Sequence, residues 1–182
     1  MKDGRLSHCR QRRSPNCDRR PAGQSISLLV IHNISLPPGR FGNRYIEDFF
    51  CNRLTVDAHP FFAQIACLHV SAHLVIDRLG KITQFVNFKD RAWHAGQSFF
   101  QDADNCNDFS IGIELEGTDT IPYTDIQYSL LVQVTQALIH AYPLLTAERI
   151  VGHCDIAPAR KTDPGPLFDW RRYRRALQVL SV

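Results

Sequence analysis

The chain has 182 residues, of which 44% are hydrophobic and 21% charged, the size and composition of one soluble globular domain. No stretch approaches the roughly 20 apolar residues that span a bilayer, so the sequence predicts no membrane-spanning helix. The net charge is +3, yet residues 1–20 carry seven Lys or Arg and two Asp. We therefore expect a basic segment at residues 1–24, loosely ordered or docked, followed by one domain over 25–182.

The N-terminus has no apolar stretch of the kind found in secretory signal peptides, which predicts a cytoplasmic location. A basic terminus can also serve as a nucleic-acid arm, and this alternative rests on charge alone. Without a signal peptide we expect reduced thiols, several of them small core residues. The six cysteines are Cys9, Cys17, Cys51, Cys67, Cys106 and Cys154.

The first expected core element is residues 27–32, a continuous apolar run typical of a strand buried on both faces. It ends in His32, and a proline-containing loop follows. Residues 45–50 are expected to form a short helix. Two further strands, 70–77 and 82–88, are joined by a link short enough for an antiparallel hairpin.

Residues 109–116 alternate between apolar and polar side chains more clearly than any other stretch. This pattern predicts a strand with an apolar back and a polar, open front. Glu114 lies on the polar face beside Gly112, a residue that leaves room for a close approach.

A helix is predicted to begin at Thr124, because Thr124 and Gln127 have the spacing of a capping box. It should end near residue 142, before Pro143. Its expected core-facing stripe is Ile126, Leu130, Val134 and Leu138.

The C-terminal part contains a short expected strand at 150–151, a loop over 152–166 and a basic helix from 169 to about 180. Glycine and proline in the 152–166 segment argue against a helix or strand interior. Together the elements predict a single α/β domain with a mixed β-sheet covered by a few α-helices.

Candidate chemistry is concentrated at His32 and in the 152–166 loop, which holds His153 and Asp163. Two histidines and one carboxylate with an open fourth position form the pattern of catalytic zinc. These residues are far apart in sequence, however, and no short zinc-binding spacing is present. From spacing alone, a zinc site and a structural role at loop edges both stay open.

Four segments resemble a known family, in the same order and over about residues 27–170. They are LVIHNISLPPG at 29–39, RAWHAG at 91–96, CNDFSIGIELEGTD at 106–119 and GHCDIAPARKTDPGP at 152–166. These motifs resemble the 1,6-anhydro-N-acetylmuramyl-L-alanine amidases (the AmpD family), within the superfamily of peptidoglycan recognition proteins and phage amidases.

The resemblance implies that His32, His153 and Asp163 bind Zn²⁺. It also implies that Glu114 activates a water molecule and that Lys161 faces the developing oxyanion. The implied activity is zinc-dependent hydrolysis of the bond between N-acetylanhydromuramic acid and L-alanine, in cytoplasmic peptidoglycan recycling, with an effect on β-lactamase induction. The implied partners are soluble anhydromuramyl peptides, with no nucleic acid or membrane, and the expected state is a monomer.

Other residues compete for these roles. Glu116 shares a strand face with Glu114 and could be the base, and Cys154 could be a metal ligand in place of Asp163. Trp93 and His94 are candidate substrate-binding residues, although Trp93 could equally be a core residue. We expect structural roles for His59, His69 and His73.

Two other functions would use the same fold. One is a cell-wall amidase acting on intact murein, and the other is a peptidoglycan-fragment binder without catalytic activity. The presence of all five implied catalytic positions argues against the second.

Overall fold

A six-stranded mixed sheet, in the order β1-β5-β4-β9-β3-β10, forms the centre of the computed structural model, which describes residues 1–179. β2 pairs with β6 and β7 with β8 in two small antiparallel sheets. The strands are β1 (Arg10–Gln11), β2 (Cys17–Arg19), β3 (Leu28–Ile34), β4 (Leu74–Ile76), β5 (Ile82–Gln84), β6 (Asp90–Ala92), β7 (Phe99–Phe100), β8 (Ala103–Asp104), β9 (Ser110–Glu116) and β10 (Ile150–Gly152).

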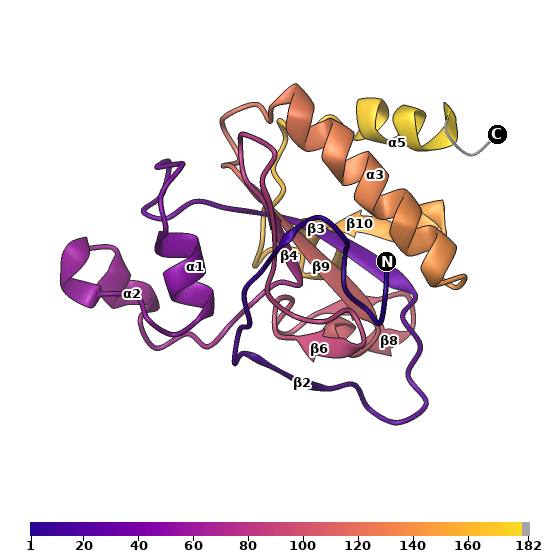
Figure 1. Cartoon of the computed structure of the whole chain (residues 1–182), viewed down its shortest axis with the longest axis horizontal. Helices are drawn as coiled ribbons and strands as arrows, with labels where there is room; N and C mark the ends of the chain where they lie inside the picture. Colours follow the sequence, from indigo (N-terminus) through magenta and orange to yellow (C-terminus); the bar gives the residue numbers. More distant parts are fainter. Residues whose placement is uncertain (180–182) are drawn as a thin grey trace.

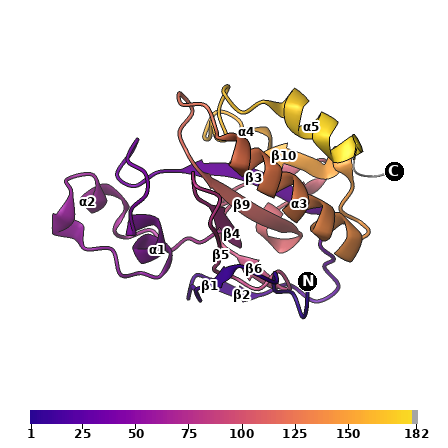
Figure 2. The same cartoon turned by 45° about the horizontal axis from the view of Figure 1, so that its top comes forward.

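Helices cover the sheet unevenly (Figure 1). Two of them, α3 and α5, lie together on one side, while α1 and α2 form a lobe that projects from the opposite end, as both views show (Figures 1 and 2). The helices are α1 (Tyr45–Phe50), α2 (Phe62–Ile65), α3 (Asp125–Ala141), α4 (His153–Ile156) and α5 (Trp170–Val179), with 3₁₀ turns at Val56–Ala58, Cys106–Asp108 and Ala147–Arg149. Residue 180, the expected end of the last helix, lies outside the described residues.

The alternation of side chains along β3 and β9 gives the sheet two different faces. Leu29 and Ile31 of β3, with Ile113 of β9, pack into the main core against α3 and α5. Leu28 and Val30 point the other way, into a smaller cluster that includes Ala95. The side chains of His32 and Glu114 belong to this second face, so one face supplies the core and the other the candidate site.

Several expected elements agree with the structure. The 45–50 helix, the central strands and the antiparallel hairpin between β4 and β5 are all present. The capping box at Thr124 is formed, since the Thr124 hydroxyl accepts from the Gln127 backbone N–H and the Gln127 side-chain oxygen accepts from the Thr124 N–H. This arrangement fixes the first turn of α3.

The expected stripe along α3 was partly wrong. Ile126 is 43% exposed, whereas Leu131 and Thr135 are fully buried. The helix contacts both the sheet and α5, so its buried arc is wider than one four-residue repeat and is shifted away from Ile126. Tyr173 of α5 reaches Thr135, and their hydroxyls are 2.6 Å apart.

The sequence predicted an open polar face on β9, and this prediction was wrong, because the face is buried along its whole length. Ser110 is 0%, Glu116 2% and Glu114 9% exposed. Residues of the segment after β6 cover the first half, and a built Cβ on Gly112 would lie 2.5 Å from the His94 ring. The space that glycine leaves is therefore occupied by a side chain of the same protein.

A second correction concerns the 152–166 segment, which begins with the one-turn helix α4 rather than a loop. The Gly152 N–H donates to Asp155 Oδ2 at 2.7 Å, which caps this turn. The prolines all follow Ile156, so they end the helix without preventing it.

The basic N-terminal segment lies against the sheet. β1 pairs with β5 and β2 with β6, and Figure 2 shows these strands together along one edge. Arg20 donates to the carbonyl oxygens of Asn107 and Ser110 at 3.0 and 2.7 Å. Burial lowers the pKa of this guanidinium to about 10, which still leaves it charged at neutral pH. Its charge-assisted hydrogen bonds therefore stabilise the start of β9.

All six cysteines are free thiols, and only Cys106 is buried, while Cys67 is exposed. The expectation that several of them are core residues therefore holds for Cys106 alone. Within residues 1–179, no helix has the length and apolarity needed to cross a membrane.

His73 is a buried structural histidine and generates a prediction. Its Nδ1 accepts from the Gly112 N–H at 3.0 Å, so its Nε2 carries the proton and donates to the Asp90 carbonyl at 3.1 Å. Burial, followed by the nearby Arg20 charge, lowers the pKa of His73 to about 3. The folded protein thus keeps His73 neutral where the unfolded chain protonates it.

The free energy of unfolding of the metal-free protein should fall as the pH drops below the ordinary histidine pKa of about 6.5, because the unfolded state binds more protons. Replacing His73→Gln should reduce this slope by about 1.4 kcal/mol per pH unit. Urea unfolding at several pH values between about 6 and 4 measures it. Equal slopes in the two proteins would contradict the neutral, buried state of His73.

Candidate metal centre and active site

Three side chains, one from β3 and two from the 152–166 segment, meet at the carboxyl ends of the central strands. The Nδ1 atoms of His32 and His153 are 3.0 Å apart, and each lies 3.0 Å from Asp163 Oδ2. In the part of the chain that the structure describes, these three form the cluster suited to hold a metal ion. Both imidazoles are nearly inaccessible to solvent, at 1% and 3%.

The parallel register of three strands brings the two histidines together. His32 is near the end of β3, which pairs with β9 on one side and β10 on the other. Gly152, the last residue of β10, is opposite Ile31. His153 follows directly as the first residue of α4, so it faces His32 across the end of the sheet.

The loop that carries Asp163 is held by hydrogen bonds to its backbone. The Cys154 N–H donates to the Asp163 carbonyl at 2.9 Å. The Tyr123 hydroxyl and the Asn33 amide donate to the next carbonyl, that of Pro164, at 2.7 and 3.1 Å. The carboxylate is therefore positioned by α4, by β3 and by the segment before α3.

The hydrogen bonds of His153 show that the cluster fits a cation. His153 Nε2 is 3.0 Å from the carbonyl oxygen of Ala95, which can only accept, so Nε2 carries the proton. In the neutral ring Nδ1 is then a bare acceptor, facing a carboxylate oxygen and a second imidazole nitrogen. Acceptors about 3 Å apart repel one another unless a proton or a metal ion lies between them.

The pKa of each ionisable group in the cluster depends on its neighbours as well as on burial. Burial lowers the pKa of His32 to about 4, against the opposing effect of its hydrogen bond with Asp163. Burial alone would raise the pKa of Asp163, but its hydrogen bonds with His153 and His32 bring it below the ordinary value. The protein thus presents neutral His32 and ionised Asp163, the forms that bind metals.

Glu114 lies directly opposite His32 in the β3–β9 register. Its Oε2 is buried without a hydrogen-bond partner. Burial and the nearby Asp163 raise the pKa of Glu114 well above its ordinary value, and Lys161 acts in the opposite direction. A buried carboxyl with an unpaired oxygen beside a metal-type cluster is suited to exchange protons with a ligand in the cleft.

Lys161 is exposed and lies in the same loop as Asp163, where its amide donates to the Ala157 carbonyl at 3.0 Å. It lines the cleft together with Glu114. Its charge lowers the pKa of both His32 and Glu114, so it acts on the cluster electrostatically.

Glu116, the rival candidate for the base, is occupied elsewhere. Its Oε1 accepts from the Gly42 N–H at 2.7 Å and its Oε2 from the Arg78 N–H at 3.2 Å. This 2%-exposed carboxylate ties two loops to the end of β9. Cys154, the rival ligand, is likewise outside the cluster, and its Sγ contacts Asp155 Oδ1 at 3.9 Å.

The cluster opens into a cleft of about 820 Å³ between the sheet and the α1–α2 lobe. Its lining combines apolar side chains with polar groups, and the polar groups include residues of β3 and of the loop after β9. The apolar side chains include Leu36, Phe61, Ile65 and Leu68, and the polar ones include Asn33, Thr118, Asp119 and Thr120.

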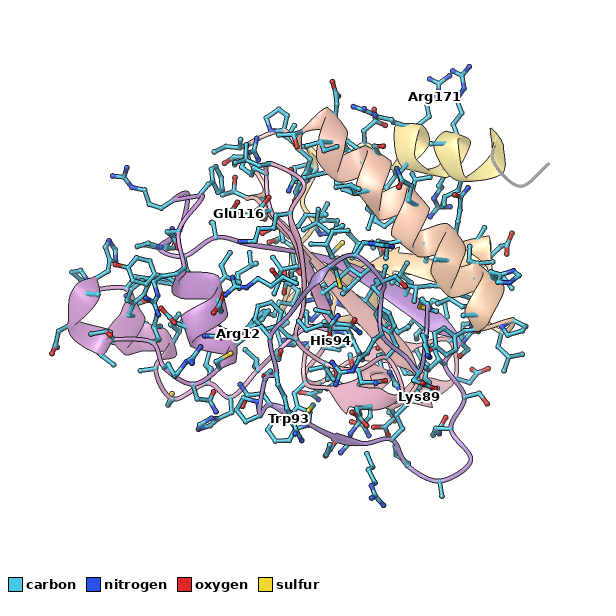
Figure 3. The ribbon with its side chains drawn as sticks, viewed as in Figure 1. Arg12, Lys89, Trp93, His94, Glu116 and Arg171 are labelled. Atoms are coloured by element: carbon cyan, nitrogen blue, oxygen red, sulfur yellow. The ribbon has the colours of Figure 1, made fainter. Side chains whose placement is uncertain are left out.

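Trp93 and His94, the candidate substrate-binding residues, both line this cleft. Figure 3 shows His94 toward the centre of the molecule and Trp93 nearer its edge. Trp93 is half-buried, so it is neither a fully enclosed core residue nor a free surface one. Both ring nitrogens of His94 contact protein side chains, those of His32 and Ser110.

Sequence reasoning missed the residues that surround the two histidines. Ala95 acts through its carbonyl oxygen, and Asn107 accepts from the His94 and Ala95 amides at 3.1 and 2.8 Å. A backbone carbonyl carries no sequence signal. The signal that was available is Gly112, because a glycine inside a strong strand pattern marks the close approach of another group.

Comparison with known proteins defines the class. The family model described as N-acetylmuramoyl-L-alanine amidase matches residues 22–166, and the chain belongs to this family. AmpD of Haemophilus influenzae is 57% identical over 173 residues, covering 95% of this chain and 94% of the relative. AmpD of Escherichia coli is also 57% identical, covering 96% and 94%.

Solved structures agree with this assignment. A crystal structure of an AmpD selenomethionine derivative superposes with a TM-score of 0.95, at 55% identity and covering 97% of this chain and 98% of that one. E. coli AmiD, in complex with anhydro-N-acetylmuramic acid-L-Ala-D-γ-Glu-L-Lys as substrate, gives a TM-score of 0.61 at 31% identity. That match covers 87% of this chain and 60% of the other.

The two neighbouring glutamates are expected to respond differently to the same substitution. Glu116→Gln places an amide N–H₂ against a backbone N–H and should destabilise the fold by about 1–3 kcal/mol. Glu114→Gln removes no protein hydrogen bond from Oε2, so it should leave stability nearly unchanged. Chemical denaturation of both variants tests this, and equal losses would contradict the structural role of Glu116.

Proposed function

We propose that this protein is a zinc hydrolase that cleaves the amide bond between N-acetylanhydromuramic acid and the L-alanine of the stem peptide. The observation that carries the proposal is the convergence of His32, His153 and Asp163 in a cleft. Membership of the amidase family supports the reaction, and identity of 55–58% to AmpD enzymes supports the substrate.

The donor set favours zinc. Two imidazole nitrogens and one carboxylate oxygen, with a fourth position facing a cleft, form the ligand pattern of catalytic zinc rather than of the oxygen-preferring Mg²⁺ or Ca²⁺. His32 and His153 would bind through Nδ1 and Asp163 through Oδ2. When bound, zinc lowers the pKa of a water molecule to about 7 and polarises a carbonyl group.

Glu114 is the proposed general base and acid. As a water oxygen attacks the lactyl carbonyl carbon, Glu114 takes the water proton. Glu114 then gives this proton to the alanine nitrogen as the C–N bond breaks, which leaves a carboxylic acid on the lactyl group of the sugar and a free amine on the peptide. The acid then releases its own proton to solvent. Burial raises the pKa of Glu114 above that of a free carboxyl group, which moves it toward the working pH, where an acid–base group transfers protons best in both directions.

Lys161 is the proposed partner of the negative charge that develops on the carbonyl oxygen. Support comes from its place in the cleft lining and from its effect on the pKa of Glu114. A cation at this point stabilises the transition state more than the ground state.

The cleft agrees with a ligand that has an apolar ring face and a polar peptide. Its apolar lining residues suit the sugar ring, and its polar lining residues suit peptide amides and carboxylates. We place the reaction in the cytoplasm, in the recycling of soluble cell-wall fragments, on the basis of the similarity to AmpD. The monomeric state is part of the same proposal.

The direct test is incubation with N-acetylanhydromuramyl-L-Ala-D-Glu-meso-diaminopimelate, followed by mass spectrometry. Release of free tripeptide that stops on chelation and returns with zinc is expected. Absence of release from a zinc-loaded protein would contradict the proposal and favour a peptidoglycan-binding role. Equal turnover of intact sacculi would instead favour a cell-wall amidase.

Glu114→Gln should bind zinc like the wild type and lower turnover by about 10²–10⁴-fold, because it removes the proton acceptor and not a metal ligand. Zinc content by mass spectrometry and kcat on the muropeptide measure the two effects. Glu116→Gln is the matched control and should keep kcat close to wild type. Wild-type turnover in the Glu114 variant would rule out the assignment.

Asp163→Ala should lose zinc and activity together, since it removes one of three protein ligands. Asp119→Asn is the control, because Asp119 also lines the cleft but its Oδ1 accepts from the Asn33 amide at 2.7 Å. Zinc retained after dialysis distinguishes the two variants. Full zinc occupancy in Asp163→Ala would exclude this carboxylate as a ligand.

A further inference from the structure

The His94 ring lies between the metal cluster and strand β9. Its Nδ1 is 3.0 Å from His32 Nε2, and its Nε2 is 3.1 Å from Ser110 Oγ. The rings of His94 and His32 are nearly perpendicular, at 86°, with centroids 5.0 Å apart. The edge of one imidazole therefore points at a nitrogen of the other.

We propose that His94 is a positioning residue that orients His32 as a metal ligand, and that Gly112 provides the space for its ring. This inference rests on the proposed metal site. It assigns His94 to the support of the metal cluster rather than to substrate binding.

The direction of the hydrogen bonds follows from the geometry. If His32 Nδ1 binds the metal, that nitrogen is bare, and the ring proton is on Nε2. His32 Nε2–H then donates to His94 Nδ1, and His94 Nε2–H donates to the Ser110 hydroxyl oxygen. Each donor has an acceptor, and the chain ends at a buried side chain that can accept.

Without His94, the Nε2–H of His32 would be a buried donor with no partner, because His32 is 1% exposed. The ring could then carry its proton on the nitrogen that faces Asp163, a form that cannot bind a metal through Nδ1. Partners of this kind fix the tautomer and the orientation of metal-binding histidines.

Gly112 explains how the ring reaches this position. A Cβ on Gly112 would lie 2.5 Å from Cγ and Nδ1 of His94, closer than atoms can approach without a shift. Gly112 does not have a positive φ, so its backbone conformation does not require glycine. The requirement comes from the ring packed on it.

The adjacent residue performs the same task for the second histidine. The Ala95 carbonyl accepts from His153 Nε2 at 3.0 Å. Asn107 Oδ1 holds the His94 and Ala95 amides, at 3.1 and 2.8 Å. One two-residue segment thus orients both imidazoles of the cluster, the first through a side chain and the second through a carbonyl.

Zinc affinity of the full-length protein, measured by competition with a chelating dye, tests the proposal. His94→Leu should weaken zinc binding by roughly 10–100-fold. His94→Asn should restore most of this loss, because its amide oxygen can accept near the place of Nδ1. The visible absorption of the Co²⁺-substituted protein should change in the leucine variant and return toward wild type in the asparagine variant.

The Gly112→Ala substitution provides an independent test of the proposal. Alone, it should weaken zinc binding like His94→Leu, because it displaces the ring. In a His94→Ala background it should have no further effect, since the smaller side chain leaves room for the new methyl group. Circular dichroism and urea unfolding establish that each variant is folded.

Wild-type zinc affinity and an unchanged Co²⁺ spectrum in folded His94→Leu would overturn this inference and leave the proposed function standing. A raised KM with unchanged zinc affinity would also overturn it, in favour of direct substrate contact. Additive losses for Gly112→Ala and His94→Ala would contradict the proposed role of the glycine. Failure of the wild-type protein to bind zinc would overturn the proposed function, and the inference with it.

Discussion

The parallel pairing of β3 between β9 and β10 is the constraint on which the rest of the structure depends. It places Glu114 opposite His32 and brings the end of β10, hence His153, to the same edge. A slip of one residue in either ladder would turn the polar side chains toward α3 and the apolar ones toward the cleft. The same register therefore directs the apolar side chains into the core and the polar side chains to the candidate site.

This arrangement carries an electrostatic cost in the metal-free state. Two imidazole nitrogens and a carboxylate oxygen lie 3.0 Å apart, near a second buried carboxyl whose Oε2 has no partner. Buried acceptors without donors destabilise a fold, and the surrounding sheet has to offset this. The extensive hydrogen bonding of the Asp163 loop and of residues 94–95 is consistent with a site held in place before any ligand binds.

The sequence predicted well those features that depend on local pattern. The 45–50 helix, the capping box at Thr124 and the alternation of β9 follow from residue type and spacing, and the structure contains each of them. The resemblance to amidases named candidate ligands that spacing alone left open, and the structure brings those residues together.

The predictions that were wrong concern tertiary contacts that no local sequence pattern encodes. Alternation indicates that one face of β9 is polar, but not that the segment after β6 covers it. The buried arc of α3 is set by α5, which lies far along the chain. The metal cluster joins residues separated by more than a hundred positions, and its supporting groups include a backbone carbonyl. Only Gly112 pointed to these contacts in advance.

The central claim is that His32, His153 and Asp163 bind one zinc ion. Anomalous X-ray scattering at the zinc absorption edge, from crystals of the zinc-loaded protein, tests it most directly. The account predicts a single peak about 2.0–2.2 Å from the Nδ1 atoms of both histidines and from an Asp163 oxygen. A peak bound through Nε2 of either ring, or one located away from the three side chains, would contradict it.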